Sequence, residues 1–176
     1  MTPVKINSVL MGEHSQGDVI DLASLTMDHP WHVRFIEMMP IGVTADSQFL
    51  QILSADRVKR WIESALGPLE IVNNGNLDGE AFLYRIQKSK GVIGFIKSVT
   101  QPFCSCCTRV RITADGKLRL CLLNEDEVDL ITPLRSRVPW MELRRIVLEG
   151  IWQKPWGHRL AEGEKPTDRT MSEIGG

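Results

Sequence analysis

The chain has 176 residues, 43% of them hydrophobic and 24% charged, which is typical of a folded globular protein and excludes a largely disordered one. Its 21 Lys and Arg residues nearly balance its 22 Asp and Glu residues, so the net charge of −1 argues against a general nucleic-acid or membrane-surface binder. No apolar run could span a bilayer and no secretory signal is visible, so we expect a cytoplasmic protein.

The first forty residues predict a strand, a helix and a second strand. Residues 4–11 and 31–38 are rich in β-forming side chains, and residues 18–25 between them place Val19, Leu22 and Ala23 on one helical face. Such a unit implies parallel strands, and a ligand site is expected where they end, around residues 38–42.

Beyond residue 50 the pattern changes. Ser54 is placed to cap a helix that runs to about Ala65, with Gly67-Pro68 as its end. The apolar face of this helix is expected to comprise Val58, Trp61, Ile62 and Ala65. Strand-like runs follow at residues 69–72, 81–87 and 92–99.

The last third of the chain predicts a hairpin and one further helix. Residues 108–113 and 117–122 flank the turn Ala114-Asp115-Gly116. Residues 140–152 predict a helix with a buried apolar face, followed from residue 159 by a polar tail. The side chains expected on the buried face are Leu143, Ile146, Val147 and Ile151.

Two parallel strands do not complete a barrel or a doubly wound sheet. They leave exposed edges, and parallel sheets normally contain more strands and are covered on both faces. We therefore expect the missing strands to lie upstream in a longer natural chain or to come from a second chain.

Three of the four cysteines crowd into residues 104–107, which indicates metal binding rather than disulfides. Cys104 and Cys107 are spaced to hold one metal centre, and Cys121, on the return strand of the hairpin, is expected beside them. Spacing alone leaves two readings open. One is a structural zinc site closed by Cys106 or His158; the other is an iron–sulfur cluster held by three cysteines, with one iron open to a substrate atom.

Arg109 and Arg111 follow the cysteine pair directly. In a strand, both side chains would point to the same face, where two guanidinium forks beside a metal would suit a polyphosphate. The alternative is a pair of solvated arginines at a sheet edge.

Residues 103–121 (FCSCCTRVRITADGKLRLC) resemble the C-terminal cluster segment of the MoaA family, the radical SAM GTP 3′,8-cyclases of molybdenum cofactor biosynthesis. Residues 3–7 (PVKIN) and 33–40 (VRFIEMMP) are similar to the late barrel strands of that family, and residues 154–158 (KPWGH) and 171–176 (MSEIGG) to its C-terminal end. The resemblance implies an α/β fold. Residues 1–45 would be the last two βα units of a truncated, partial TIM-type barrel, and residues 46–176 an α+β region that binds the cluster and GTP.

By this resemblance, Cys104, Cys107 and Cys121 would hold a [4Fe–4S] cluster whose open iron binds the purine of GTP. The other implied site residues are Arg109 and Arg111 for catalysis and GTP, Lys5 for GTP, Arg34 and Met39 for S-adenosylmethionine, and Gly175 and Gly176 as a catalytic tail. From the sequence alone, Lys5 reads as an ordinary strand lysine, Met39 as a core methionine and the glycines as a frayed end. Cys106 is not a ligand in the family pattern, and its role is open.

The family's N-terminal Cys-x3-Cys-x2-Cys motif, which holds a second [4Fe–4S] cluster with S-adenosylmethionine, does not occur in this sequence. The expected function is thus the substrate-binding half of an enzyme that converts GTP to 3′,8-cyclo-7,8-dihydro-GTP, inactive until the other barrel half is supplied in cis or in trans. A homodimer is compatible with the resemblance for the full-length family members, and no nucleic acid or membrane partner is expected. The alternative is a non-catalytic iron–sulfur or zinc module that binds nucleotides.

Overall fold

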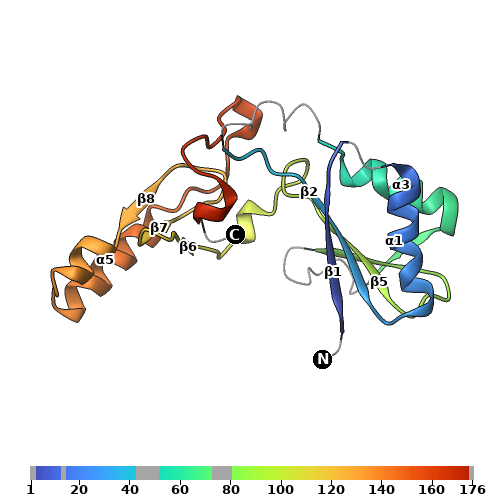
Figure 1. The fold of residues 1–176 in the computed structure, drawn as a ribbon, viewed down its shortest axis with the longest axis horizontal. Helices are drawn as coiled ribbons and strands as arrows, with labels where there is room; N and C mark the ends of the chain where they lie inside the picture. Colours follow the sequence, from blue (N-terminus) through green and yellow to red (C-terminus); the bar gives the residue numbers. More distant parts are fainter. Residues whose placement is uncertain (1–2, 13–14, 43–51, 73–80, 175–176) are drawn as a thin grey trace. The chain divides into compact units, whose positions relative to one another are not determined.

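The computed structural model describes residues 3–12, 15–42, 52–72 and 81–174 (Figure 1). The chain forms two compact units. The first unit comprises residues 1–38 and 49–103, and the second comprises residues 39–48 and 104–176. The boundary expected between residues 45 and 46 lies outside the described residues.

The first unit contains a five-stranded mixed sheet in the order β1-β2-β5-β4-β3. Its strands are β1 (Lys5–Leu10), β2 (His32–Glu37), β3 (Leu69–Ile71), β4 (Phe82–Ile86) and β5 (Val92–Ile96). β1 pairs with β2 in parallel, which confirms the predicted unit. The expectation of two exposed strand edges is wrong for β2, because β5 pairs with it in parallel and β4 extends the sheet in the antiparallel sense, whereas β1 lies at the edge of the sheet.

Two helices of the first unit are begun by serine caps. The Ser15 side chain accepts from Asp18 N ahead of α1 (Gln16–Asp28), and the Asp18 side chain accepts in return from Ser15 N, a complete capping box. The predicted cap of α3 (Ala55–Leu66) is confirmed: the Ser54 side chain accepts from Arg57 N, and Gly67 follows the helix.

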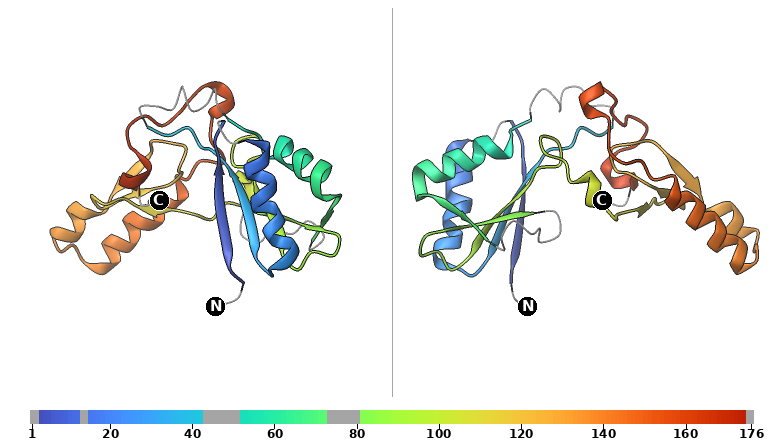
Figure 2. Two further views of the ribbon diagram at one scale, coloured as in Figure 1. Left: turned by 45° about the vertical axis from the view of Figure 1, so that its right-hand side comes forward. Right: turned by 180° about the vertical axis from the view of Figure 1, so that it is seen from behind.

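The core of the first unit lies between α1, α3 and one face of the sheet (Figures 1 and 2). Alternate residues of β2 are buried, and the rings of Phe35 and Phe95 stack with centroids 6.0 Å apart. Val58 and Ile62 of α3 are buried as predicted, but Ala65 is exposed and Ala55 is buried instead. The two helices therefore fix the strands that carry Lys5 and Arg34.

The second unit is built on a three-stranded antiparallel sheet, β6-β7-β8. Its elements are β6 (Arg111–Ile112), β7 (Lys117–Arg119), β8 (Glu127–Asp129), α4 (Ile131–Arg135), α5 (Trp140–Trp152) and short 3-10 helices at Cys104–Cys106, Leu160–Glu162 and Met171–Ile174. The predicted hairpin is confirmed with shorter strands, whereas β8 and α4 were not predicted. Gly116 turns the hairpin at φ +82°, where a Cβ atom would also lie 2.7 Å from Ile131 Cβ.

α5 has the predicted bounds, but its predicted buried face is wrong. Gly150, which lies against Val128 of β8, is its one buried residue in the structure as described. Leu143, Ile146 and Val147 are half-buried and Ile151 is exposed, because the three short strands offer too little surface to cover the helix. An apolar groove of about 280 Å³ lies along the helix, and Trp140, Trp152 and Trp156 are exposed.

Among the described residues, no helix combines the length and the apolar character needed to cross a bilayer.

Candidate metal and nucleotide site

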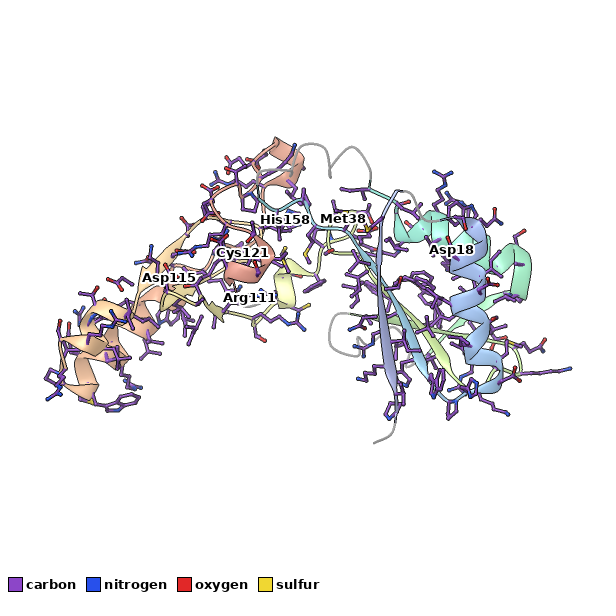
Figure 3. The ribbon with its side chains drawn as sticks, in the orientation of Figure 1. Asp18, Met38, Arg111, Asp115, Cys121 and His158 are labelled. Carbon is purple, nitrogen blue, oxygen red and sulfur yellow. The ribbon has the colours of Figure 1, made fainter. Side chains whose placement is uncertain are left out.

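The three candidate cysteine ligands belong to the second unit. Cys104 begins the 3-10 helix Cys104–Cys106, and Cys107 N donates to Cys104 O at 3.2 Å, which closes a tight turn around the pair. Cys121 follows β7 at the other foot of the hairpin (Figure 3). All four cysteines of the chain are thiols rather than disulfides.

The surroundings of Cys121 shift the pKa of its thiol. Burial raises its pKa above the ordinary value, and negative charge at Cys104 and Cys107 raises it further, while a backbone hydrogen bond and the Lys154 ammonium act in the opposite direction. Three thiolates in one neighbourhood repel one another, and a bound cationic centre would relieve that repulsion. The donor set is soft and thiolate-rich, which fits an iron–sulfur cluster.

The same thiols do not surround a single point. In residues 3–12, 15–42, 52–72 and 81–174, no three His, Cys, Asp or Glu side chains are grouped so as to hold one metal ion. Among these residues the structure therefore does not contain a closed zinc tetrahedron completed by Cys106 or His158, and the convergence of Cys104, Cys107 and Cys121 stays a prediction.

Lys154 joins the two feet of the hairpin. Its Nζ donates to Arg109 O at 2.8 Å and to Leu120 O at 2.6 Å, so one ammonium binds a carbonyl just after Cys107 and another just before Cys121. Gly157, three residues later, lies on Cys104: a Cβ atom at this position would be 3.8 Å from Cys104 Sγ. Sequence reasoning assigned no role to Lys154, although the run KPWGH that contains it was noted.

The arginine pair is placed differently from the prediction. β6 begins at Arg111, so Arg109 lies outside the strand, and the expectation that both side chains share a strand face stays a prediction. Arg111 pairs with Arg119 of β7, and Arg119 pairs with Glu127 of β8. Residues directly opposite one another in antiparallel strands share a face, so Arg111, Arg119 and Glu127 form a charged row across the sheet.

Arg119 is the buried centre of an ionic cluster that sequence reasoning missed. Its side chain is fully buried, and its guanidinium donates to Glu127 at 3.0 Å and to both carboxylate oxygens of Asp168 at 2.9 and 3.2 Å. Arg169 extends the cluster to Glu127 at 2.7 Å and to Asp115 at 2.8 Å. This ionic cluster therefore links the hairpin to the C-terminal segment of the chain.

The first unit carries Lys5 and Arg34. Lys5 and Asn7 are exposed on alternate positions of β1, and Asn7 is in register with Arg34 and Arg34 with Gly94. Lys5 and Arg34 thus share the sheet face opposite the helices. A Cβ atom at Gly94 would lie 3.0 Å from Arg34 Cγ, so the glycine leaves room for the arginine side chain to cross the sheet.

A buried carboxylate fixes the end of β2. Glu37 is fully buried and accepts hydrogen bonds from Ala55 N at 3.0 Å, Val99 N at 3.0 Å, Thr100 N at 2.8 Å and the Thr100 hydroxyl. It ties the strand end to the start of α3 and to the loop after β5. The candidate residue Met39 follows two positions later, at the start of the second unit, and Gly175 and Gly176 lie outside the described residues.

Comparison with known families identifies the chain. Residues 31–160 match the model of the family described as Molybdenum Cofactor Synthesis C. The chain belongs to this family. Three curated relatives, each named GTP 3′,8-cyclase, come from Gloeobacter violaceus (42% identical over 179 residues), Pelotomaculum thermopropionicum (39% over 174) and Moorella thermoacetica (39% over 176). These alignments include 99–100% of this chain and 53–54% of each relative, so the chain spans about half the length of the curated relatives that it matches.

The part of the chain that matches the Molybdenum Cofactor Synthesis C family contains most of the site described above. It includes the three candidate cysteine ligands, Arg34, Met39, Arg109, Arg111, Arg119 and Lys154. Lys5, Asp168 and the terminal glycines lie outside the matched range but inside the stretch aligned with the relative from Moorella thermoacetica, which covers the whole chain.

Proposed function

We propose that this chain is the GTP- and cluster-binding portion of a GTP 3′,8-cyclase, which converts GTP to 3′,8-cyclo-7,8-dihydro-GTP in molybdenum cofactor biosynthesis. The observation that carries the proposal is geometric: Cys104, Cys107 and Cys121 lie at the two feet of one hairpin, where Lys154 Nζ donates to Arg109 O and Leu120 O and Gly157 lies on Cys104. The names of the relatives support the assignment of GTP as the substrate.

In this proposal Cys104, Cys107 and Cys121 hold a [4Fe–4S] cluster. When bound, such a cluster supplies an iron with an open coordination position for an atom of the substrate base. Lys154 holds the carbonyls of Arg109 and Leu120 and so keeps both feet of the hairpin in place around the cysteines.

Arg109 and Arg111 bind the triphosphate, since a guanidinium fork forms paired, charge-assisted hydrogen bonds with phosphate oxygens. Lys5 adds a third cationic contact to GTP, Arg34 and Met39 contact S-adenosylmethionine, and Gly175 and Gly176 take part in catalysis. S-adenosylmethionine and a second [4Fe–4S] cluster belong, by resemblance, to the other half of the family's barrel, supplied in cis or in trans. The sheet of the first unit is then part of that barrel.

Reconstitution separates this proposal from a zinc module. Incubation of the chain with iron and sulfide without oxygen should give broad absorbance near about 400 nm. Replacing Cys104, Cys107 or Cys121 with Ser should abolish this absorbance, whereas the matched control Cys106→Ser should retain it. Loss of the chromophore in Cys106→Ser alone, or uptake of zinc with no cluster formed, would overturn the ligand assignment.

Nucleotide binding tests the substrate. GTP should bind the reconstituted chain and change the EPR spectrum of the reduced cluster, whereas CTP should leave the spectrum unchanged because it lacks the purine. Arg111→Lys should weaken GTP binding about tenfold, since lysine keeps the charge but loses the fork. Equal binding of GTP and CTP without a spectral change would show that the site attracts phosphate groups without recognising the base.

A further inference from the structure

The C-terminal segment, residues 166–174, is fastened to the second unit at several points. Gly42 N donates to Pro166 O at 2.9 Å, and Ala114 N donates to Glu173 O at 3.4 Å. Thr167 N donates to Glu125, and Ile174 is fully buried. A chain end held in this way is ordered by its contacts and does not behave as an exposed tail.

The C-terminal segment also forms an ion pair with the hairpin, between Asp168 and Arg119. Asp168 occupies both nitrogens at the tip of the guanidinium, and this is the bidentate geometry that gives Arg–carboxylate pairs their strength and direction. The Arg119 side chain is fully buried, while the Asp168 side chain is 30% exposed. Arg119 is also two residues before the ligand candidate Cys121.

The pair also controls the charge of the face that carries Arg111. Arg119 lies directly opposite Arg111 in the hairpin, and like charges at opposite positions destabilise a sheet. Glu127 and Asp168 neutralise Arg119, and Arg169 of the same C-terminal segment bridges Glu127 and Asp115. The segment is therefore built into the ionic surroundings of the candidate triphosphate site.

We infer that Arg119 and Asp168 are positioning residues, which hold residues 166–174 as a wall of the site where Arg111 binds the nucleotide. The inference rests on the proposed function for the identity of the nucleotide, GTP, and on the structure for the anchoring itself. Neither residue is proposed to touch the substrate.

The test compares Asp168→Asn with Glu164→Gln in the full chain. Each substitution removes one carboxylate that pairs with an arginine, and the two carboxylates are only four residues apart in the chain. Each also makes the net charge more positive by one. Glu164 pairs with Arg159, and both of these side chains are 60% exposed. Since GTP is an anion, a purely electrostatic effect would strengthen its binding in both variants, so the sign of the change distinguishes positioning from charge.

Hydrogen exchange reports the anchoring without any nucleotide. In Asp168→Asn, the amides of Gly42 and Ala114, which donate to the segment, should exchange about tenfold faster than in the parent chain, while Glu164→Gln leaves them unchanged. GTP binding to the reconstituted chain should weaken about tenfold in Asp168→Asn only. Asp168→Glu keeps the carboxylate and should restore most of the slow amide exchange and most of the GTP affinity.

The possible failures are distinct. Unchanged exchange in Asp168→Asn shows that the pair does not hold the segment, and faster exchange with unchanged or stronger GTP binding shows that the segment does not position the site; either result overturns the inference. Absence of GTP binding in the parent chain overturns the proposed function instead, and with it the link to the nucleotide, while the exchange measurement still decides the anchoring.

Discussion

The two units of this chain are stabilised in different ways. In the first unit, helices cover one face of a five-stranded sheet, and the largest buried side chains are apolar, among them Phe35, Phe95 and Ile93. In the second unit, the largest fully buried side chain is Arg119, and its two carboxylate partners come from a neighbouring strand and from the C-terminal segment. Burial of apolar surface depends weakly on pH, whereas an ionic cluster depends on the protonation of its carboxylates. The candidate cluster site therefore lies on the unit whose largest buried side chain depends on charged partners.

The largest expected effect is a cavity in the first unit. Phe95 is fully buried between Phe35 and Tyr84, with ring centroids 6.0 and 5.6 Å away. Phe95→Ala should lower the free energy of unfolding of the first unit by roughly 3–5 kcal/mol, measured by hydrogen exchange of the β2 and β5 amides. Ile112→Ala, at a side chain that is 63% exposed in the second unit, should change stability by less than about 0.5 kcal/mol. An equal loss of unfolding free energy in the two variants would show that the units do not differ in how they depend on buried apolar side chains.

Acid should act mainly on the second unit. Burial by itself raises the pKa values of Asp168 and Glu127, but hydrogen bonds and charge from Arg119 and Arg169 outweigh it, so both pKa values lie below normal. The Arg169 hydrogen bond, helped by the Thr113 hydroxyl, also lowers the pKa of Asp115. Carboxylates with lowered pKa values stabilise the fold fully above their ordinary pKa of about 4 and lose that effect as the pH falls through the folded values.

We therefore expect the anchoring of residues 166–174 to be constant from neutral pH down to about pH 5 and to weaken below about pH 4. Exchange rates of the Gly42 and Ala114 amides, corrected for intrinsic pH dependence, measure this change. The amides of β4 serve as the internal reference, because the buried carboxylate of Glu37 lies at the end of β2. Simultaneous loss of protection in both units would show that the ionic cluster is not the acid-sensitive element.

The smallest expected effect is on a single thiol. Burial raises the pKa of Cys121 above its ordinary value, and the positive charge of the Lys154 ammonium opposes this rise. Lys154→Met keeps the apolar stem and removes the charge, so the Cys121 pKa should rise and its alkylation by iodoacetamide near pH 8 should slow about threefold. Lys59→Met makes the same chemical change in the first unit and should have no effect on that rate. Faster alkylation in Lys154→Met would mean that opening of the hairpin feet outweighs the lost charge.

Local patterns predicted most of the elements. The helix at residues 140–152, the Ser54 cap and the parallel pairing of β1 with β2 each follow from spacing within one or two turns or strands, and all are confirmed. The burial of α5 was wrong because periodicity shows which side chains share a face, but not whether anything covers that face.

The features that sequence reasoning missed depend on contacts between distant residues. β5 pairs with β2 across 60 residues, and Arg119 contacts Asp168 across 49. No local period or turn signal encodes such partners. The candidate ligands Cys104, Cys107 and Cys121 could be proposed because their spacing is itself the signal, whereas Lys154 could not, since it acts by binding main-chain carbonyls.

The distribution of tryptophans gives the two units separate optical signals. Trp140, Trp152 and Trp156 of the second unit are exposed, while Trp31 and Trp61 of the first are half-buried. Indole emission shifts to longer wavelength in water, so unfolding of the second unit should hardly move the emission band, and a red shift should report the first unit. Trp156 directly precedes Gly157, which lies on Cys104, so an iron-containing chromophore held there would quench its fluorescence. The intensity of unlabelled protein would thus follow cluster loading, and the colour of its emission would follow unfolding of the first unit.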